Sequence, residues 1–159
     1  MKGLELSRRF YTDCVEPILA QSFPVISARY AAGLVGFGSD VLGNDDEYSR
    51  DHEWGPRCQV FLNTQDHAKF GQAIEETLAE ELPNEFLGFP AKFSRGELGS
   101  MPVTGNTGYS LVTITTPGRF LELTIGQSDI PANDAEWLAI SEQRLLEFTR
   151  GEVFVDSTG

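Results

Sequence analysis

The chain is organised around the stretch Ala31-Ala-Gly-Leu-Val-Gly-Phe-Gly-Ser-Asp40, an apolar run that ends in a glycine–serine turn. Residues 28–37 are rich in glycine and alanine and include Leu34 and Val35, which predicts a buried strand. The small side chains favour close packing of this strand against a helix. After a short polar loop comes a second distinctive stretch, Ser49-Arg-Asp-His-Glu-Trp-Gly-Pro-Arg57.

Before the first stretch, residues 4–21 have the spacing of a helix, with apolar side chains every four positions. Pro17 lies inside this segment and lacks a backbone donor, so we expect it to kink or interrupt the helix. The apolar positions are Leu6, Phe10, Cys14 and Ile18, with Tyr11, Val15 and Leu19 beside them.

After the second stretch, strands and helices are predicted in turn. Residues 94–108 show no pattern and are expected to form a flexible loop. The whole chain is then a single α+β domain over 1–159, a small mixed β-sheet packed with helices on one side. The expected strands cover 57–63, 86–93 with an interruption at Pro90, and 109–116. The expected helices cover Asn63 or Thr64 to about Leu82, Pro117 to Ile125, a short segment from Asn133 or Asp134, and Ser141 to Gly151.

Composition restricts the possible partners. The 159 residues carry a formal net charge of −12, which argues against a nucleic-acid-binding surface because phosphate contacts need clustered Lys and Arg. No apolar run approaches a membrane span, so we expect a cytoplasmic protein with no membrane partner. Cys14 and Cys58 are too few for a disulfide framework, and we expect two reduced thiols.

The two stretches together suggest a triphosphate site. Asp51 and Glu53 are two positions apart, so an extended backbone would place both carboxylates on one face. Oxygen ligands of this kind suit Mg²⁺, which commonly bridges protein carboxylates and phosphates. Gly38 allows the hydroxyl and amide groups around Ser39 to approach a phosphate closely. The alternatives are a solvated carboxylate pair that meets Arg50 or Arg57, and a serine that only caps a turn or helix.

Gly38-Ser39 followed by Asp51-x-Glu53 resembles the signature of the nucleotidyltransferase-fold superfamily, the polymerase-beta-like one. The longer string with Arg-Asp-His-Glu-Trp-Gly-Pro-Arg57 is similar to a bacterial branch described as a domain of unknown function. Weaker similarity reaches Trp137-Leu and the stretch that begins at Ser141, so it covers most of the chain. Members usually continue beyond this length, so the chain is either the N-terminal part of a longer protein or a naturally short member.

The resemblance implies a Mg²⁺-dependent nucleotidyltransferase, which moves a nucleoside monophosphate from a nucleoside triphosphate to an unknown hydroxyl or amine acceptor. By position, Gly38 and Ser39 would contact the nucleotide, and Arg57 is a further candidate for the phosphates. Asp51 and Glu53 would hold Mg²⁺ and act in catalysis. For Arg57 a second interpretation, pairing with a nearby acid, stays open.

The predicted strand 109–116 favours a different function. The resemblance implies a third carboxylate on this strand, yet Thr113 and Thr115 occupy the expected positions. The alternative is therefore a degenerate, non-catalytic domain that binds nucleotide or another protein. Trp54 is expected to be a packing anchor rather than a platform for a base.

Overall fold

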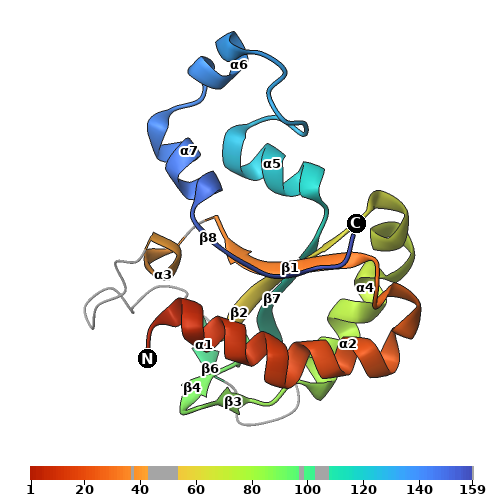
Figure 1. The fold of residues 1–159 in the computed structure, drawn as a ribbon. Coiled ribbons are helices and arrows are strands. Elements are labelled where there is room, and N and C mark those ends of the chain that lie inside the picture. Colours follow the sequence, from red (N-terminus) through yellow and green to blue (C-terminus); the bar gives the residue numbers. More distant parts are fainter. Residues whose placement is uncertain (37, 43–53, 97–98, 103–107, 159) are drawn as a thin grey trace.

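The computed structural model describes residues 1–36, 38–42, 54–96, 99–102 and 108–158 (Figure 1). Its centre is a six-stranded sheet with the strand order β6-β5-β7-β2-β1-β8. β2 and β7 are parallel and the other neighbouring strands are antiparallel, so the sheet is mixed. This confirms the α+β fold class. The strands are β1 (Tyr30–Val35), β2 (Arg57–Leu62), β5 (Lys92–Gly96), β6 (Gly99–Pro102), β7 (Tyr109–Thr115) and β8 (Gly151–Asp156).

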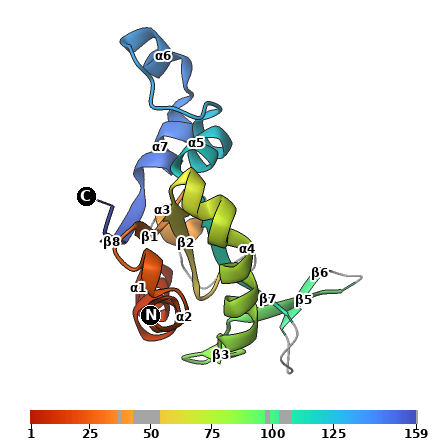
Figure 2. The same ribbon diagram turned by 90° about the vertical axis from the view of Figure 1, so that its right-hand side faces the viewer.

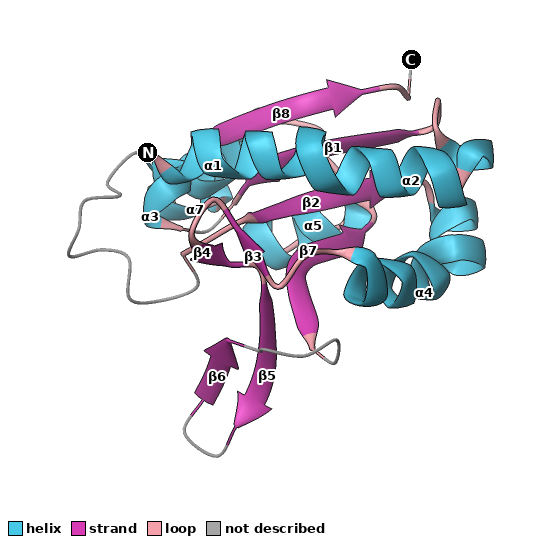
Figure 3. Cartoon of the chain, turned by 90° about the horizontal axis from the view of Figure 1, so that it is seen from below, coloured by secondary structure: helices cyan, strands magenta, loops and turns pink. Residues whose placement is uncertain are grey.

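Helices cover both faces of this sheet, although the sequence suggested helices on one side only. α1, α2 and α4 lie on one face, and α5 and α7 lie behind the sheet in the view from below (Figure 3). The side chains of β2 alternate accordingly, with Cys58, Val60 and Leu62 buried toward the first group of helices. The apolar core lies on that side.

The first helical segment confirms the predicted helix and shows how it tolerates Pro17. α1 (Gly3–Phe10) continues through a π-helical turn, η1 (Tyr11–Val15), into α2 (Glu16–Ser22). In the π-turn the Glu16 N–H donates to the Tyr11 carbonyl, five residues back. Pro17 then lies at the start of α2, where a missing N–H costs little. A short 3₁₀ turn, η2 (Pro24–Ile26), leads into β1.

α4 (Thr64–Glu81) is the longest helix and follows the sequence prediction closely. The Asn63 side chain caps it by accepting a hydrogen bond of 2.8 Å from the Asp66 N–H. Two apolar side chains of this helix, Ile74 and Leu78, are buried. It packs on β7 and β2, so it fixes the parallel pair from one side.

Two predictions between α4 and β7 were wrong. The predicted strand 86–93 is instead a small hairpin, β3 (Glu85–Phe86) and β4 (Phe89–Pro90), followed by the start of β5. Leu87 and Gly88 turn the chain with φ values of 52° and 86°, the left-handed conformation typical of tight hairpins. The predicted loop 94–108 contains the end of β5 and all of β6, a pair that projects from the body of the molecule (Figure 2).

The last part of the chain follows the predicted helices and adds a strand. α5 (Pro117–Ile125), α6 (Asp134–Ala139) and α7 (Glu142–Thr149) begin at Thr116, Asn133 and Ser141, whose side chains cap them. Gly151 ends the helical part as expected, but the chain then forms β8, which the sequence prediction missed. Within the described residues, no helix combines the length and the apolar character needed to cross a membrane.

Candidate functional site

The topology places one end of each of the strands β1, β2 and β7 at the same side of the sheet. This side, called the edge below, is formed by strand ends and not by an outer strand. Because β1 and β2 are antiparallel and β2 and β7 are parallel, the C-terminal end of β1 lies beside the N-terminal ends of the other two. Gly38 and Ser39 follow β1, Arg57 begins β2, and Tyr109 begins β7. The structure therefore places three of the predicted site residues, Gly38, Ser39 and Arg57, at the same edge.

The turn after β1 depends on glycine at position 38. Gly38 has a φ of 133°, a conformation that residues with a side chain rarely adopt. A Cβ atom here would also collide with the Arg57 guanidinium and the Asp40 carboxylate. Ser39 starts the four-residue helix α3 (Ser39–Leu42) directly after it. The predicted turn chemistry of Gly38 is thus confirmed by both its backbone and its surroundings.

Arg57 forms a two-pronged ion pair with Asp40. The Arg57 Nη2 lies 2.5 Å from the Asp40 Oδ1, and the Nε lies 3.1 Å from the Oδ2. The exposed fraction of the Asp40 side chain is 1%, and that of Arg57 is 14%. The Val41 N–H donates a further 2.9 Å bond to the same carboxylate. Of the two interpretations of Arg57, the structure shows the pairing with an acid, while its contact with a nucleotide stays a prediction.

The start of α1 packs directly against this ion pair. A Cβ at Gly3 would lie 2.5 Å from the Asp40 Cβ and 2.8 Å from the Trp54 Nε1, so only glycine fits here. Trp54 packs edge-on against Phe89, with the ring centroids 4.9 Å apart. Trp54 is therefore the packing anchor that the sequence favoured.

Gln59 is a further polar residue of this edge, and sequence reasoning missed it. Its side-chain amide donates to the Val35 carbonyl at 3.0 Å and accepts from the Val35 N–H at 3.1 Å. The amide thus stands in for the backbone bonds of the neighbouring strand and holds the end of β1. The only sequence signal was its place two residues after Arg57, which puts both side chains on one face of β2.

A hollow of about 270 Å³ opens between β2 and β7 at this edge. The register places Thr113 of β7 opposite Gln59, and Thr113 is exposed. The described strand β7 therefore presents a hydroxyl where the resemblance implied a third carboxylate, and Thr115 is buried. The lining residues of the hollow are Arg57, Cys58, Gln59, Tyr109, Ser110, Leu111 and Thr113.

Asp51 and Glu53, the predicted catalytic and Mg²⁺-binding residues, lie outside the described residues. Over the part of the chain that the structure describes, no group of three or more His, Cys, Asp or Glu side chains could hold a metal ion. The prediction of Mg²⁺ therefore depends on these two carboxylates. They precede Trp54 closely in the sequence, between α3 and β2.

The neighbouring thiol at Cys58 has no sign of reactivity. Cys58 is 1% exposed, and burial raises its pKa to about 12. Because the thiolate is the nucleophilic form, the Cys58 thiol stays unreactive near neutral pH. The chemistry of the edge is therefore that of hydroxyl, amide and guanidinium groups.

Comparisons of the chain with protein-family models, curated proteins and solved structures found no match.

Proposed function

We propose that this domain binds a nucleoside triphosphate at the edge formed by β1, β2 and β7 and transfers its nucleoside monophosphate to a hydroxyl or amine acceptor. The observation that supports this most is the meeting of the Gly38-Ser39 turn with Arg57 at one edge. The sequence between these two points contains Asp51 and Glu53. A glycine–serine turn, a fixed cation and two carboxylates are groups that can bind and orient a triphosphate for nucleotidyl transfer.

Each residue then has a chemical role. Ser39 offers its hydroxyl and backbone amide to phosphate oxygens, and Asp40 holds the Arg57 guanidinium in place beside them. Asp51 and Glu53 would hold Mg²⁺, which neutralises the charge of the triphosphate. The acceptor oxygen or nitrogen would attack the α-phosphorus and give its proton to solvent water, while the bond to the departing pyrophosphate breaks.

A second candidate function, nucleotide binding without catalysis, is favoured by one specific observation. Thr113 faces the hollow from β7 at the register position opposite Gln59. A threonine hydroxyl is a poor general base, so it cannot accept the acceptor's proton as a carboxylate would. The two candidates share the binding site and differ in whether the α-phosphorus is attacked.

Calorimetric titration with ATP, GTP, CTP and UTP, with and without Mg²⁺, tests the shared site. We expect at least one triphosphate to bind in the presence of Mg²⁺, and Asp51→Asn to weaken that binding about tenfold or more. Asp129→Asn removes the same charge from an exposed loop and serves as the matched control. Absence of binding by all four triphosphates, or equal binding by Asp51→Asn, would overturn the proposed site.

Pyrophosphate release separates the two candidates. A transferase releases pyrophosphate, slowly with water as acceptor and faster with added alcohols or amines. We expect Thr113→Asp to increase this rate about tenfold or more by supplying a base, and Thr113→Asn, which adds no charge, to leave it unchanged. Binding without pyrophosphate release from either the natural protein or Thr113→Asp would favour the non-catalytic domain.

A further inference from the structure

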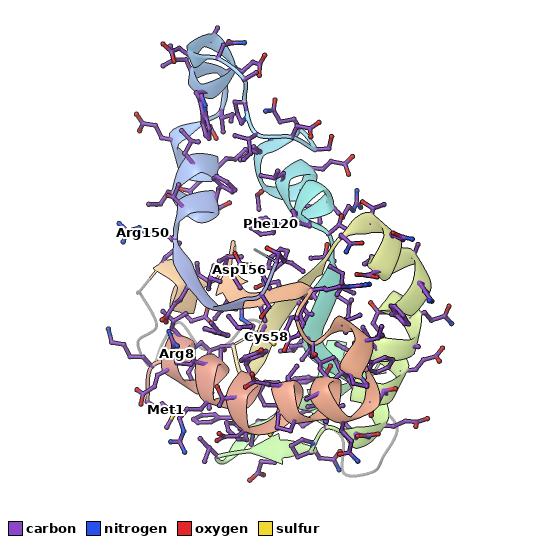
Figure 4. The ribbon with its side chains drawn as sticks, turned by 45° about the vertical axis from the view of Figure 1, so that its right-hand side comes forward. Met1, Arg8, Cys58, Phe120, Arg150 and Asp156 are labelled. Atoms are coloured by element: carbon purple, nitrogen blue, oxygen red, sulfur yellow. The ribbon has the colours of Figure 1, made fainter. Side chains whose placement is uncertain are left out.

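A second cavity, here called the aromatic cavity, lies on the same face of the sheet as the hollow but shares no lining residue with it. It is bounded by β2, α5, α7 and the end of β8, and its volume is about 480 Å³. Cavities that hold small molecules commonly have volumes of about 300–1,000 Å³. Phe120 and Asp156, both labelled in Figure 4, line this cavity from α5 and from the end of β8.

Three phenylalanine rings from three different elements form its walls. Phe61 of β2 meets Phe120 of α5 edge-to-face, with the ring centroids 5.4 Å apart and an interplanar angle of 87°. The ring centroid of Phe120 also lies 6.3 Å from the ring centroid of Phe148 of α7. At the margin, Ile130 is 67% exposed although it lines the cavity. The walls therefore offer an apolar surface and aromatic faces, which attract both hydrocarbon groups and cations.

The polar end of the cavity carries a negative charge. The Asp156 carboxylate accepts hydrogen bonds from the Thr158 hydroxyl at 2.6 Å and the Thr158 N–H at 2.9 Å. These bonds lower the pKa of Asp156, so it is ionised at neutral pH. Asn63, which also lines the cavity, is occupied by its bonds to Asp66. Among the described residues that line the cavity, Asp156 is the only ionisable one.

We propose that the aromatic cavity binds a hydrophobic organic cation, an ammonium group carried on an aromatic or branched aliphatic body. The body would pack among Phe61, Phe120 and Phe148, and the ammonium would pair with the Asp156 carboxylate at the rim. The net charge of −12 raises the local concentration of cations near the protein and repels anionic amphiphiles. This assignment does not depend on the proposed nucleotide site, because the two cavities have no lining residue in common.

A matched series of probes tests the charge preference. The probes are 2-naphthylmethylammonium, the neutral 2-naphthylmethanol and the anionic 2-naphthoate, titrated into the whole chain and followed by nuclear magnetic resonance. We expect the ammonium to bind about three- to fivefold more tightly than the alcohol, as an exposed ion pair allows, and the carboxylate to bind most weakly. The methyl signals of Leu121 and Ile130 should shift, because both residues line the cavity.

Two variants test whether Asp156 supplies the charge preference and whether the phenylalanine rings supply the binding surface. Asp156→Asn should remove most of the preference for the ammonium over the alcohol while the alcohol still binds. Glu147→Gln is the matched control, since it removes one charge from α7 at a residue that does not line the cavity. Phe148→Leu keeps an apolar side chain but removes one ring, and it should weaken all three probes in a protein whose circular dichroism is unchanged.

The inference would be overturned by several clear outcomes. These are no binding of any probe, tightest binding of 2-naphthoate, equal binding of ammonium and alcohol, or methyl shifts confined to residues away from the cavity. An equal loss of the ammonium preference in Glu147→Gln would also overturn it, because the general negative charge would then explain the result. None of these outcomes bears on triphosphate binding at the other cavity.

Discussion

Asp40 and Arg57 show how one ion pair positions a whole turn. Taking a carboxylate and a guanidinium out of water is costly, and three hydrogen bonds to the Asp40 carboxylate offset that cost here. The pair ties α3 to the start of β2, and the missing side chain of Gly38 leaves room for both groups. The position of Ser39 relative to β2 therefore depends on this pair.

Replacing Arg57 should destabilise the protein strongly. Arg57→Met leaves the Asp40 carboxylate buried without its cation, and we expect the free energy of unfolding to fall by about 3 kcal/mol, as measured by urea denaturation. Adding Asp40→Asn to Arg57→Met should restore part of this loss, because the unpaired charge disappears.

The matched control is an exposed ion pair of the same type. Arg119 and Glu122 are more than half exposed, so Arg119→Met should change the free energy of unfolding by less than about 1 kcal/mol. Similar losses for Arg57→Met and Arg119→Met would contradict the argument that burial makes the Asp40–Arg57 pair important.

For individual residues, the sequence predicted which residue type a position requires better than it predicted which other residue that position contacts. The need for glycine at position 38 follows from local turn chemistry, and the structure confirms it. The roles of Asp40 and Gln59 depend on residues distant in the sequence, on Arg57 for one and on Val35 for the other. Periodicity and spacing contain no information about such pairings. Whether Asp51 and Glu53 hold a metal stays a prediction, since both lie outside the described residues.

Among the elements, helices with a polar cap were predicted well. Asn63, Asn133 and Ser141 each satisfy a backbone N–H at the start of a helix, so the signal is local. The hairpin at Leu87 was missed because its left-handed turn begins with a leucine, a residue that rarely adopts this conformation. The sequence prediction also missed β6 and β8. β6 is short and contains glycine, and β8 is an exposed outer strand. Neither therefore shows the alternation of apolar and polar residues that predicts a strand.

Two of these caps make a matched test of what each helix contributes. Asn63→Ala removes the cap of α4, which carries Ile74 and Leu78 into the core, and should lower the free energy of unfolding by about 1 kcal/mol. Asn133→Ala removes the same kind of cap from α6, in which no residue is buried, and should leave the main unfolding transition nearly unchanged. Urea denaturation of both variants measures the difference. Equal losses would show that α6 is part of the cooperative core.

The whole molecule has two unequal halves on either side of one sheet. α1, α2 and α4 share the apolar core with β1 and β2. On the other face, α5 carries Leu121 and Ile125 into buried positions, whereas α6 and α7 contain no fully buried residue. Leu138 of α6 is 85% exposed. The stability of the fold should therefore come mainly from the first face.

Hydrogen exchange should reveal this asymmetry directly. We expect the amides of α6 and α7 to exchange through local opening, at a lower free energy than those of β1 and α4, which should exchange only on global unfolding. Native-state exchange followed by mass spectrometry or nuclear magnetic resonance measures both groups in one sample. Protection of α6 equal to that of α4 would show that the second face unfolds together with the first.

The pairing of β1 with β8 has a consequence for how the protein is made. Ala31 pairs with Asp156, so the strand that completes this side of the sheet is translated long after its partner. While the ribosome synthesises the intervening chain, β1 can already pair with β2, but its other side has no native neighbour. The nascent domain thus spends most of its synthesis with an open strand edge that could pair with other chains. The arrival of β8 covers the open side of β1, and β8 then becomes the outer strand on this side of the sheet.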